Sequence, residues 1–171
     1  MKYVSLTDCK EEVFPYIYEQ LSSAEPSAKY EEEPEGLKEL EKVLALVKQN
    51  SFYPTLIEKA AYILCSIAGS QYFSNGNKRL GVVTLLQFLI VNSVVVLVLS
   101  NEDAYIELLR KAFPQHTWEH NSEIKDGNPL FLYNLAIVIG DRKKWSKNDN
   151  FTAVKEKITK MFQTLYIYEE T

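Results

Sequence analysis

The chain has 171 residues, a formal net charge of −4 and a pI near 5.3, with 46% hydrophobic and 25% charged residues. This length suits one well-buried domain, and the composition is typical of a globular protein. The acidic balance argues against non-specific nucleic-acid binding, which requires a basic face.

The N-terminal region carries charged residues throughout Lys2–Glu12, which interrupt any apolar segment there. We therefore expect no secretory signal and a cytoplasmic protein. Cys9 and Cys65 are the two cysteines. In a chain without that signal they are predicted to be free thiols rather than a disulfide, with Cys65 in the core.

The first half of the chain predicts two helices joined by a polar segment. The first helix is expected from about Asp8 to Leu21, with Pro15 as a point of kinking or early termination. The polar segment ends in the acidic run Glu31–Glu33, which we interpret as a solvated loop placed before a helix start. Pro34 suits the first turn of the second helix, whose apolar spacing continues to Asn50.

The middle of the chain predicts the core of the fold. Thr55 and Glu58 form a capping box that opens a helix ending near Gly69. A further helix, Asn77 to about Val91, is apolar almost all round and should be the buried central helix. Polar residues interrupt the apolar run 80–99. We therefore expect this helix followed by a short β-like segment, 94–99, rather than a membrane span.

The last third predicts three more helices. Ser100 and Asp103 form a capping box that opens a helix ending before Pro114. Asn128 and the proline after it suit the cap and first turn of a helix that reaches Gly140. A final amphipathic helix spans roughly 151–165. The sequence shows no internal repeat or domain boundary, so we predict one all-α domain over residues 1–171.

The segment Gln71–Arg79 is the most informative part of the chain. Gly76 is followed by Asn77, Lys78 and Arg79, and these residues open the apolar helix. A helix N-terminus presents unpaired N–H donors and partial positive charge, which suit phosphate oxygens. Two cations would oppose the helix dipole there unless an anion binds. The pattern therefore predicts a phosphate-binding site.

These nine residues resemble the signature of the Fic/Doc family, His-x-Phe-x-[Asp/Glu/Asn]-[Gly/Ala]-Asn-[Lys/Gly]-Arg. Five positions match, namely Phe73, Gly76, Asn77, Lys78 and Arg79. The Lys-Arg ending is similar to the Doc branch, and the resemblance is strongest over residues 36–109. It implies a compact helical domain and a transferase that moves AMP or a phosphoryl group from ATP or another nucleotide onto a protein hydroxyl.

The resemblance also implies roles for the individual loop residues. Lys78 and Arg79 would bind phosphate, the first as a point charge and the second as a two-pronged fork. The other phosphate-binding positions would be Ser74, Gly76 and Asn77, the asparagine also ordering the loop. Phe73 would be a buried structural anchor. Asn75 stands where many members hold Mg²⁺ with a carboxylate, so we expect weaker metal binding there.

Gln71 departs from the family because it replaces the histidine that takes the proton from the attacking hydroxyl. An amide has no usable basicity near pH 7, and loss of a general base typically costs ~10²–10⁴-fold in rate. We therefore expect a catalytically impaired chain. A natural pseudoenzyme and an inactivating substitution both explain Gln71. His116 and His120 are interpreted as exposed loop histidines, and the sequence does not place either near Gln71.

The expected partners are a target protein and a nucleotide, with no nucleic acid or membrane. The family's inhibitory pattern, [Ser/Thr]-x-x-x-Glu-[Gly/Asn], is absent, so a toxin controlled by a separate antitoxin chain is the interpretation. The basic run Arg142–Lys147 is either a contact for an acidic partner or a simple basic helix end. Two other functions stay open: a non-catalytic nucleotide- or partner-binding module, and a helical interaction protein with a fortuitous loop.

Overall fold

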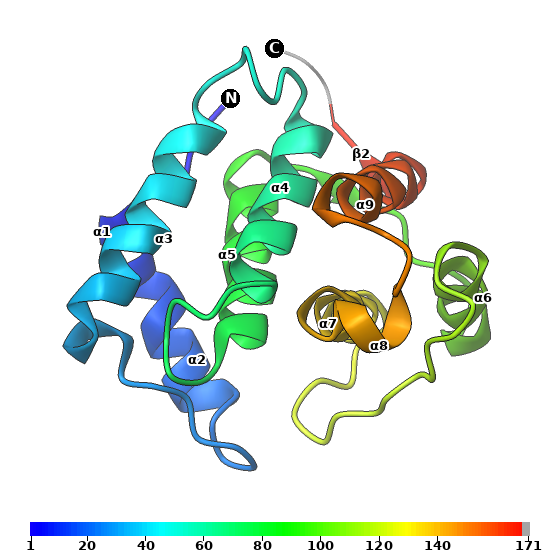
Figure 1. Cartoon of the computed structure of the whole chain (residues 1–171), viewed down its shortest axis with the longest axis horizontal. Coiled ribbons are helices and arrows are strands. Elements are labelled where there is room, and N and C mark those ends of the chain that lie inside the picture. Colours follow the sequence, from blue (N-terminus) through cyan, green and yellow to red (C-terminus); the bar gives the residue numbers. More distant parts are fainter. Residues whose placement is uncertain (169–171) are drawn as a thin grey trace.

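Three helices form the centre of the computed structural model, which describes residues 1–168. They are α4 (Leu56–Ala68), α5 (Asn77–Val91) and α7 (Gly127–Gly140), and α5 packs against both of the others (Figure 1). Every α5 side chain from Arg79 to Leu85 is buried. The prediction of an all-α fold with a buried central helix after the signature loop is therefore confirmed.

The N-terminal helical segment begins earlier than predicted. It consists of α1 (Leu6–Asp8), a five-residue π-helical turn, η1 (Cys9–Val13), and α2 (Phe14–Gln20). Ser5 and Asp8 form a capping box that the sequence analysis overlooked. Pro15 lies in the first turn of α2, directly after the wide π-turn, where its missing N–H is tolerated.

The next helices follow the sequence prediction closely. A 3₁₀ turn, η2 (Tyr30–Glu32), precedes α3 (Pro34–Val47), and Pro34 opens α3 as expected. The capping box of Thr55 and Glu58 is present at the start of α4, with the Glu58 N–H 3.2 Å from the threonine hydroxyl. These starts were predictable because each signal lies within one helical turn.

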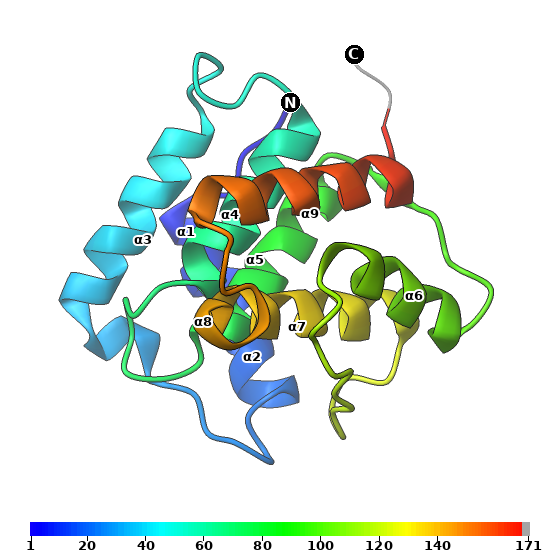
Figure 2. The same cartoon turned by 45° about the vertical axis from the view of Figure 1, so that its right-hand side comes forward.

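The remaining helices are α6 (Glu102–Ala112), α8 (Arg142–Trp145) and α9 (Phe151–Leu165), and α9 lies across α4 (Figure 2). Two predicted helix starts were wrong by one or two residues. Asn101, not Ser100, caps α6 by accepting the Ala104 N–H at 3.0 Å. Helix α7 begins at Gly127, so Asn128 lies inside its first turn.

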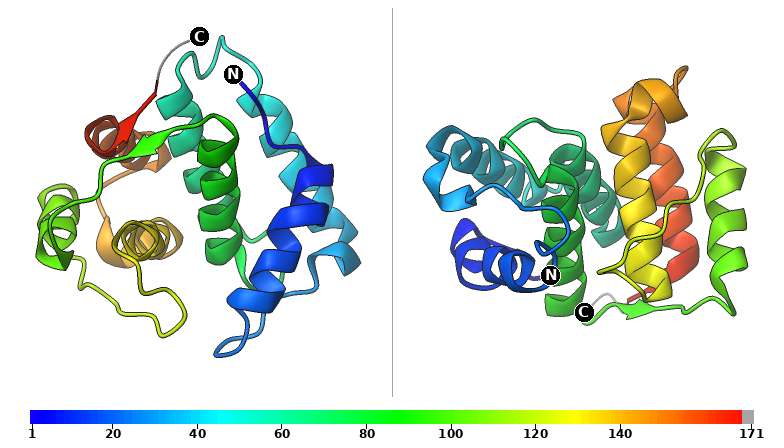
Figure 3. Two further views of the ribbon diagram at one scale, coloured as in Figure 1. Left: turned by 180° about the vertical axis from the view of Figure 1, so that it is seen from behind. Right: turned by 90° about the horizontal axis from the view of Figure 1, so that it is seen from below.

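Two short strands form an antiparallel pair. β1 (Val95–Val96) follows α5, and its partner β2 (Tyr166–Ile167) follows α9 (Figure 3). The extended run after α5 was predicted, whereas its partner was not. Among residues 1–168, none of the helices is both long and apolar enough to span a membrane.

One hydrophobic core runs through the helices from Val4 to Tyr166. Cys9 and Cys65 are buried free thiols within it, as predicted. Burial raises the pKa of each thiol to about 12, which makes both poor nucleophiles.

Candidate functional site

The signature loop lines a polar cleft of about 480 Å³. One wall is the loop itself and the start of α5. The other walls come from residues 24–25, from the loop 119–123 that precedes α7, and from the end of α7. The cleft therefore collects segments that are far apart in the sequence around the residues that resemble the family signature.

Asn77 fixes the shape of the signature loop. Its side-chain oxygen accepts the Phe73 N–H at 3.1 Å, and its amide donates to the Phe73 carbonyl at 2.8 Å. The Phe73 side chain is buried and packs edge-on against Tyr30, with ring centroids 4.9 Å apart. The expected loop-ordering role of Asn77 and the buried position of Phe73 are both observed.

Gly76 gives the loop its sharp entry into α5. Its φ of +81° is a conformation that other residues rarely adopt, and an added Cβ would lie 2.5 Å from the Tyr30 hydroxyl. The same hydroxyl donates to the Gly76 carbonyl at 3.0 Å. The buried Tyr30, which the sequence analysis did not indicate, therefore stabilises the start of α5 through its contact with Gly76.

The start of α5 presents free N–H donors to the cleft. Leu80 is the first α5 residue whose N–H reaches a helical acceptor, the Gly76 carbonyl at 2.9 Å. The N–H groups of Asn77, Lys78 and Arg79 precede it, and no side chain among residues 1–168 caps them. This arrangement suits an anion, because the donors and the positive end of the helix dipole coincide.

Lys78 places its ammonium group at the edge of this helix start. The nitrogen lies 3.9 Å from a carboxylate oxygen of Asp141, and both side chains are partly exposed. An exposed pair at this distance contributes at most about 1 kcal/mol, so a phosphate can displace the carboxylate. The lysine stem passes over Gly140, where a Cβ would lie 2.5 Å from the Lys78 Cε atom.

Arg79 makes contacts that the sequence did not indicate. Its side chain is buried, and its guanidinium group donates to the carbonyls of Leu21 at 2.6 Å, of Pro26 at 3.2 Å, and of Glu25. Most of the donors expected to grip phosphate are thus directed to residues 21–29, which we call the strap. The observed role of Arg79 is to hold the strap beside the cleft.

Ser74 also faces a partner that the sequence did not indicate. Its N–H and its hydroxyl lie 2.8 Å and 2.5 Å from the two carboxylate oxygens of Glu33. These are the donors expected to contribute to the phosphate site. In this structure a carboxylate of the chain itself satisfies them, which leaves the start of α5 and Lys78 as the donors of the candidate phosphate site.

Asn75 does not fit a Mg²⁺ site in this conformation. Its side-chain oxygen accepts the Gly76 N–H at 2.7 Å, while its amide donates to the Pro26 carbonyl at 2.7 Å. Mg²⁺ prefers oxygen ligands, commonly one or two carboxylates. The residues described, 1–168, contain no group of three or more histidine, cysteine or acidic side chains that could hold a metal ion.

Gln71 lines the cleft and is exposed. Its side chain makes no hydrogen bond to any residue in the described part of the chain. It is available to orient a hydroxyl group through its amide. It cannot remove a proton, because an amide has no basic lone pair near neutral pH.

The loop opposite Gln71 is firmly anchored. Asn134 on α7 accepts the Glu119 N–H at 2.8 Å and donates to the Glu119 carbonyl at 2.9 Å. Glu123 accepts the N–H groups of Ser23 at 2.9 Å and of Ala24 at 3.3 Å. A hydrogen bond from the Ser23 hydroxyl, together with these N–H bonds, holds the pKa of the Glu123 carboxyl below its usual value. The loop is therefore fixed to α7 at one end and to the strap at the other.

The two histidines have different environments, which corrects the prediction that both are exposed. His116 is buried, with its Nε2 atom 2.8 Å from the Asn134 side-chain oxygen and its ring edge-on to Trp145. His120 is exposed and lines the cleft together with Gln71. No local signal separates the two, because the burial of His116 depends on an amide 18 residues away.

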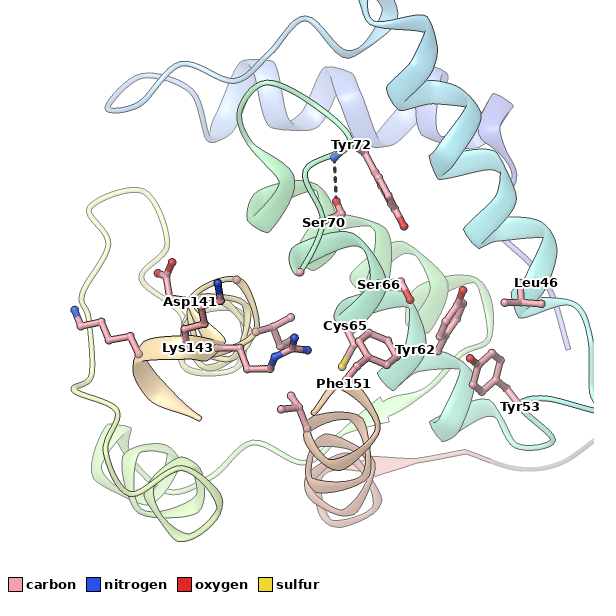
Figure 4. Close-up of a pocket in the computed structure, with 16 residues that line it drawn as sticks. Leu46, Tyr53, Tyr62, Cys65, Ser66, Ser70, Tyr72, Asp141, Lys143 and Phe151 are labelled. Atoms are coloured by element: carbon pink, nitrogen blue, oxygen red, sulfur yellow. Dashed lines mark hydrogen bonds between the residues drawn. The ribbon is translucent and has the colours of Figure 1, made fainter. Parts of the chain in front are cut away.

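A second pocket, of about 860 Å³, adjoins the cleft at Ser70, Gly140 and Asp141. Figure 4 shows its two sides, with Tyr53 and Tyr62 on one and Asp141 and Lys143 on the other. The two tyrosine rings stack with centroids 4.2 Å apart. This pocket is larger, but it contains no residue from the start of α5. The smaller cleft is therefore the candidate functional site.

Residues 10–89 match the model of the Fic/DOC family. This segment belongs to the Fic/DOC family. No curated protein and no solved structure gives a significant match to it. The matched segment contains the strap, the signature loop and most of α5, whereas the Fic/DOC match does not extend to the opposite loop, 119–123.

The sequence analysis did not indicate several residues that hold the signature loop or the strap in place. Glu33, Tyr30 and Glu123 all contact the signature loop or the strap. Glu33 was interpreted only as part of a solvated acidic run. Each contact joins residues 41 to 100 positions apart, and no pattern within a single helix or loop indicates such a pairing.

Proposed function

We propose that this Fic/DOC-family chain is a transferase that moves AMP or a phosphoryl group from a nucleotide, such as ATP, onto a hydroxyl of a target protein. The observation that carries the proposal is the start of α5, where three free N–H groups meet the ammonium group of Lys78 in an open cleft. Such transfers depend on positioning and on neutralising phosphate charge, which this arrangement supplies.

Acidic residues also line the cleft, namely Glu119 and Glu123 in the loop before α7 and Asp141 beside Lys78. These carboxylates disfavour a free polyphosphate by like-charge repulsion. A divalent cation such as Mg²⁺, bound to the nucleotide, would offset that repulsion. We therefore propose that Mg²⁺ enters with the nucleotide, since Asn75 alone does not make a metal site.

The proposed function includes a defect at the position of the family's general base, because Gln71 cannot accept the hydroxyl proton. This observation also favours a second candidate function, a non-catalytic module that uses the same cleft to bind a nucleotide or a partner. The family resemblance further motivates the proposal of a cytoplasmic toxin that is controlled by a separate antitoxin chain.

Calorimetric titration with Mg²⁺–ATP tests the nucleotide site. We expect Lys78→Ala to weaken binding about tenfold or more, because one hydrogen bond to a charged group contributes about 1.5–3 kcal/mol. Lys42→Ala is the matched control, since this exposed lysine on α3 pairs only with Glu39 and lies outside the cleft. Equal affinities for all three proteins would contradict the proposed site.

A further inference from the structure

We propose that His120 supplies the general base that Gln71 cannot provide, so that the chain as it stands retains transfer activity. This inference rests on the proposed function and names a residue outside the segment that matches the family. Within residues 1–168, His116 and His120 are the two histidines, and only His120 lines the cleft.

The backbone of His120 has a defined position. The residue before it, Glu119, is held by two hydrogen bonds to the buried side chain of Asn134 on α7. Three residues after it, Glu123 binds the strap at Ser23 and Ala24. The strap is in turn held by Arg79 of α5. His120 is thus connected on both sides to the elements that shape the phosphate site.

The imidazole ring is oriented by a carboxylate. Its Nδ1 atom lies 3.3 Å from Oε1 of Glu102 on α6, and the indole N–H of Trp118 donates to the same oxygen at 2.7 Å. A carboxylate at Nδ1 favours the tautomer that carries its proton there, which leaves the lone pair of Nε2 free. A base oriented by a third group is the usual arrangement around an activated hydroxyl.

Other charged groups around the cleft are compatible with this role. The acidic side chains on the same side are Glu119 and Glu123, and Lys78 and Asp141 belong to the opposite edge. Glu102 is the ionisable group that the structure places in contact with the ring. The base acts through the neutral ring, whose Nε2 lone pair accepts the proton.

The proposed step balances in atoms and charge. The target hydroxyl oxygen forms a bond to the α-phosphorus of ATP as the bond to pyrophosphate breaks, or to the γ-phosphorus as the bond to ADP breaks. In either case the hydroxyl proton passes to Nε2 of His120 and then to solvent. Gln71, on the signature-loop side of the cleft, can orient the hydroxyl without taking its proton.

The test measures label transferred to protein in cell extracts from ATP labelled at the α- or the γ-phosphate. Four proteins are compared with the unchanged chain: His120→Asn, Glu102→Gln, the double variant Gln71→His with His120→Asn, and Lys111→Ala. The last is the control, since Lys111 is an exposed α6 residue that pairs with Glu107. Calorimetry with Mg²⁺–ATP on the same preparations reports nucleotide binding separately.

We expect label from the unchanged chain and a loss of about 10²-fold or more in His120→Asn, the scale of general-base catalysis, with nucleotide binding retained. Glu102→Gln should lower the rate and alter its pH dependence, as expected for a positioning residue. The double variant should recover transfer by returning the family's histidine to position 71. The Lys111→Ala control should match the unchanged chain.

Two results would overturn the inference. One is the absence of label from the unchanged chain, including in extracts where the double variant gives label. The other is a His120→Asn variant that transfers as fast as the unchanged chain. If the unchanged chain still binds ATP in either case, the proposed nucleotide site remains supported. If the unchanged chain does not bind ATP, the proposed function itself is contradicted.

Discussion

Arg79 donates from two guanidinium nitrogens to backbone carbonyls of the strap, at Leu21, Glu25 and Pro26. Its planar fork suits this arrangement as well as it suits phosphate, because both present several acceptors in fixed directions. Lys78, the preceding residue, keeps its ammonium group at the open edge of the cleft. The two neighbouring cations of the signature therefore differ in role. Arg79 holds the strap, whereas Lys78 is available to a ligand in the cleft.

The Arg79→Lys variant tests this division. A lysine keeps the charge but cannot reach three carbonyls, so we expect the free energy of unfolding to fall by about 2 kcal/mol. Amide hydrogen exchange at residues 21–29 should accelerate. Lys78→Ala is the control and should leave exchange in the strap unchanged. A variant with weaker ATP binding but an unaltered strap would instead support the original prediction of a phosphate fork.

The element that shapes the site is the junction between the signature loop and α5. Its geometry depends on Gly76, on Tyr30 beneath it and on the asparagine bonds to Phe73. Burial raises the pKa of Tyr30 to about 12, so its hydroxyl stays protonated and donates to the Gly76 carbonyl at neutral pH. This junction places the first residues of α5, whose N–H groups have no capping side chain among residues 1–168, in the wall of the cleft.

Gly76→Ala should disturb this junction. The positive φ is strained for alanine, and its Cβ would approach the Tyr30 hydroxyl to 2.5 Å. We expect a loss of about 1–3 kcal/mol in the free energy of unfolding, measured in urea, together with weaker ATP binding. Adding Tyr30→Phe removes the clashing oxygen, so the double variant should lose less than the sum of the single losses. Strict additivity would show that the clash does not matter.

Sequence reasoning succeeded at this scale where the signal was local. The capping box of Thr55 and Glu58 lies within one turn, and Pro34 opens α3 where its missing N–H is harmless. The prediction was wrong where two adjacent residues could both cap a helix. Asn101 caps α6 although Ser100 precedes it, because either short polar side chain can accept the required hydrogen bond. The π-turn before α2 has no sequence signature that we recognised.

At the scale of the whole molecule, the cleft joins segments that the sequence could not bring together. The family resemblance identified the signature loop, and periodicity identified α5 as the buried helix behind it. The contacts of Glu33 with Ser74, and of Glu123 with the strap, depend on how the helices pack. The same is true of His120, whose position in the cleft follows from the packing of α6 and α7 and not from its neighbours in the chain.

The packing of the molecule also explains why two pockets adjoin while only one carries the candidate chemistry. The pocket beside Tyr53 and Tyr62 opens between α4, α8 and α9. The larger pocket is lined by the cations Arg142, Lys143 and Lys144, whereas the cleft opens at the start of α5, where a helix terminus supplies backbone N–H donors. We expect a nucleotide to select the cleft, because it combines these N–H donors with Lys78 of the signature loop.

Binding of nucleotide phosphates at the start of α5 can be followed through the backbone amide resonances during titration with Mg²⁺–ATP. We expect the largest shifts at Asn77, Lys78 and Arg79, with smaller changes in the strap and at residues 119–123. Lys78→Ala should reduce these shifts at equal nucleotide concentration. Shifts confined to the pocket around Tyr53 and Tyr62, or no shifts at the start of α5, would contradict binding at this site.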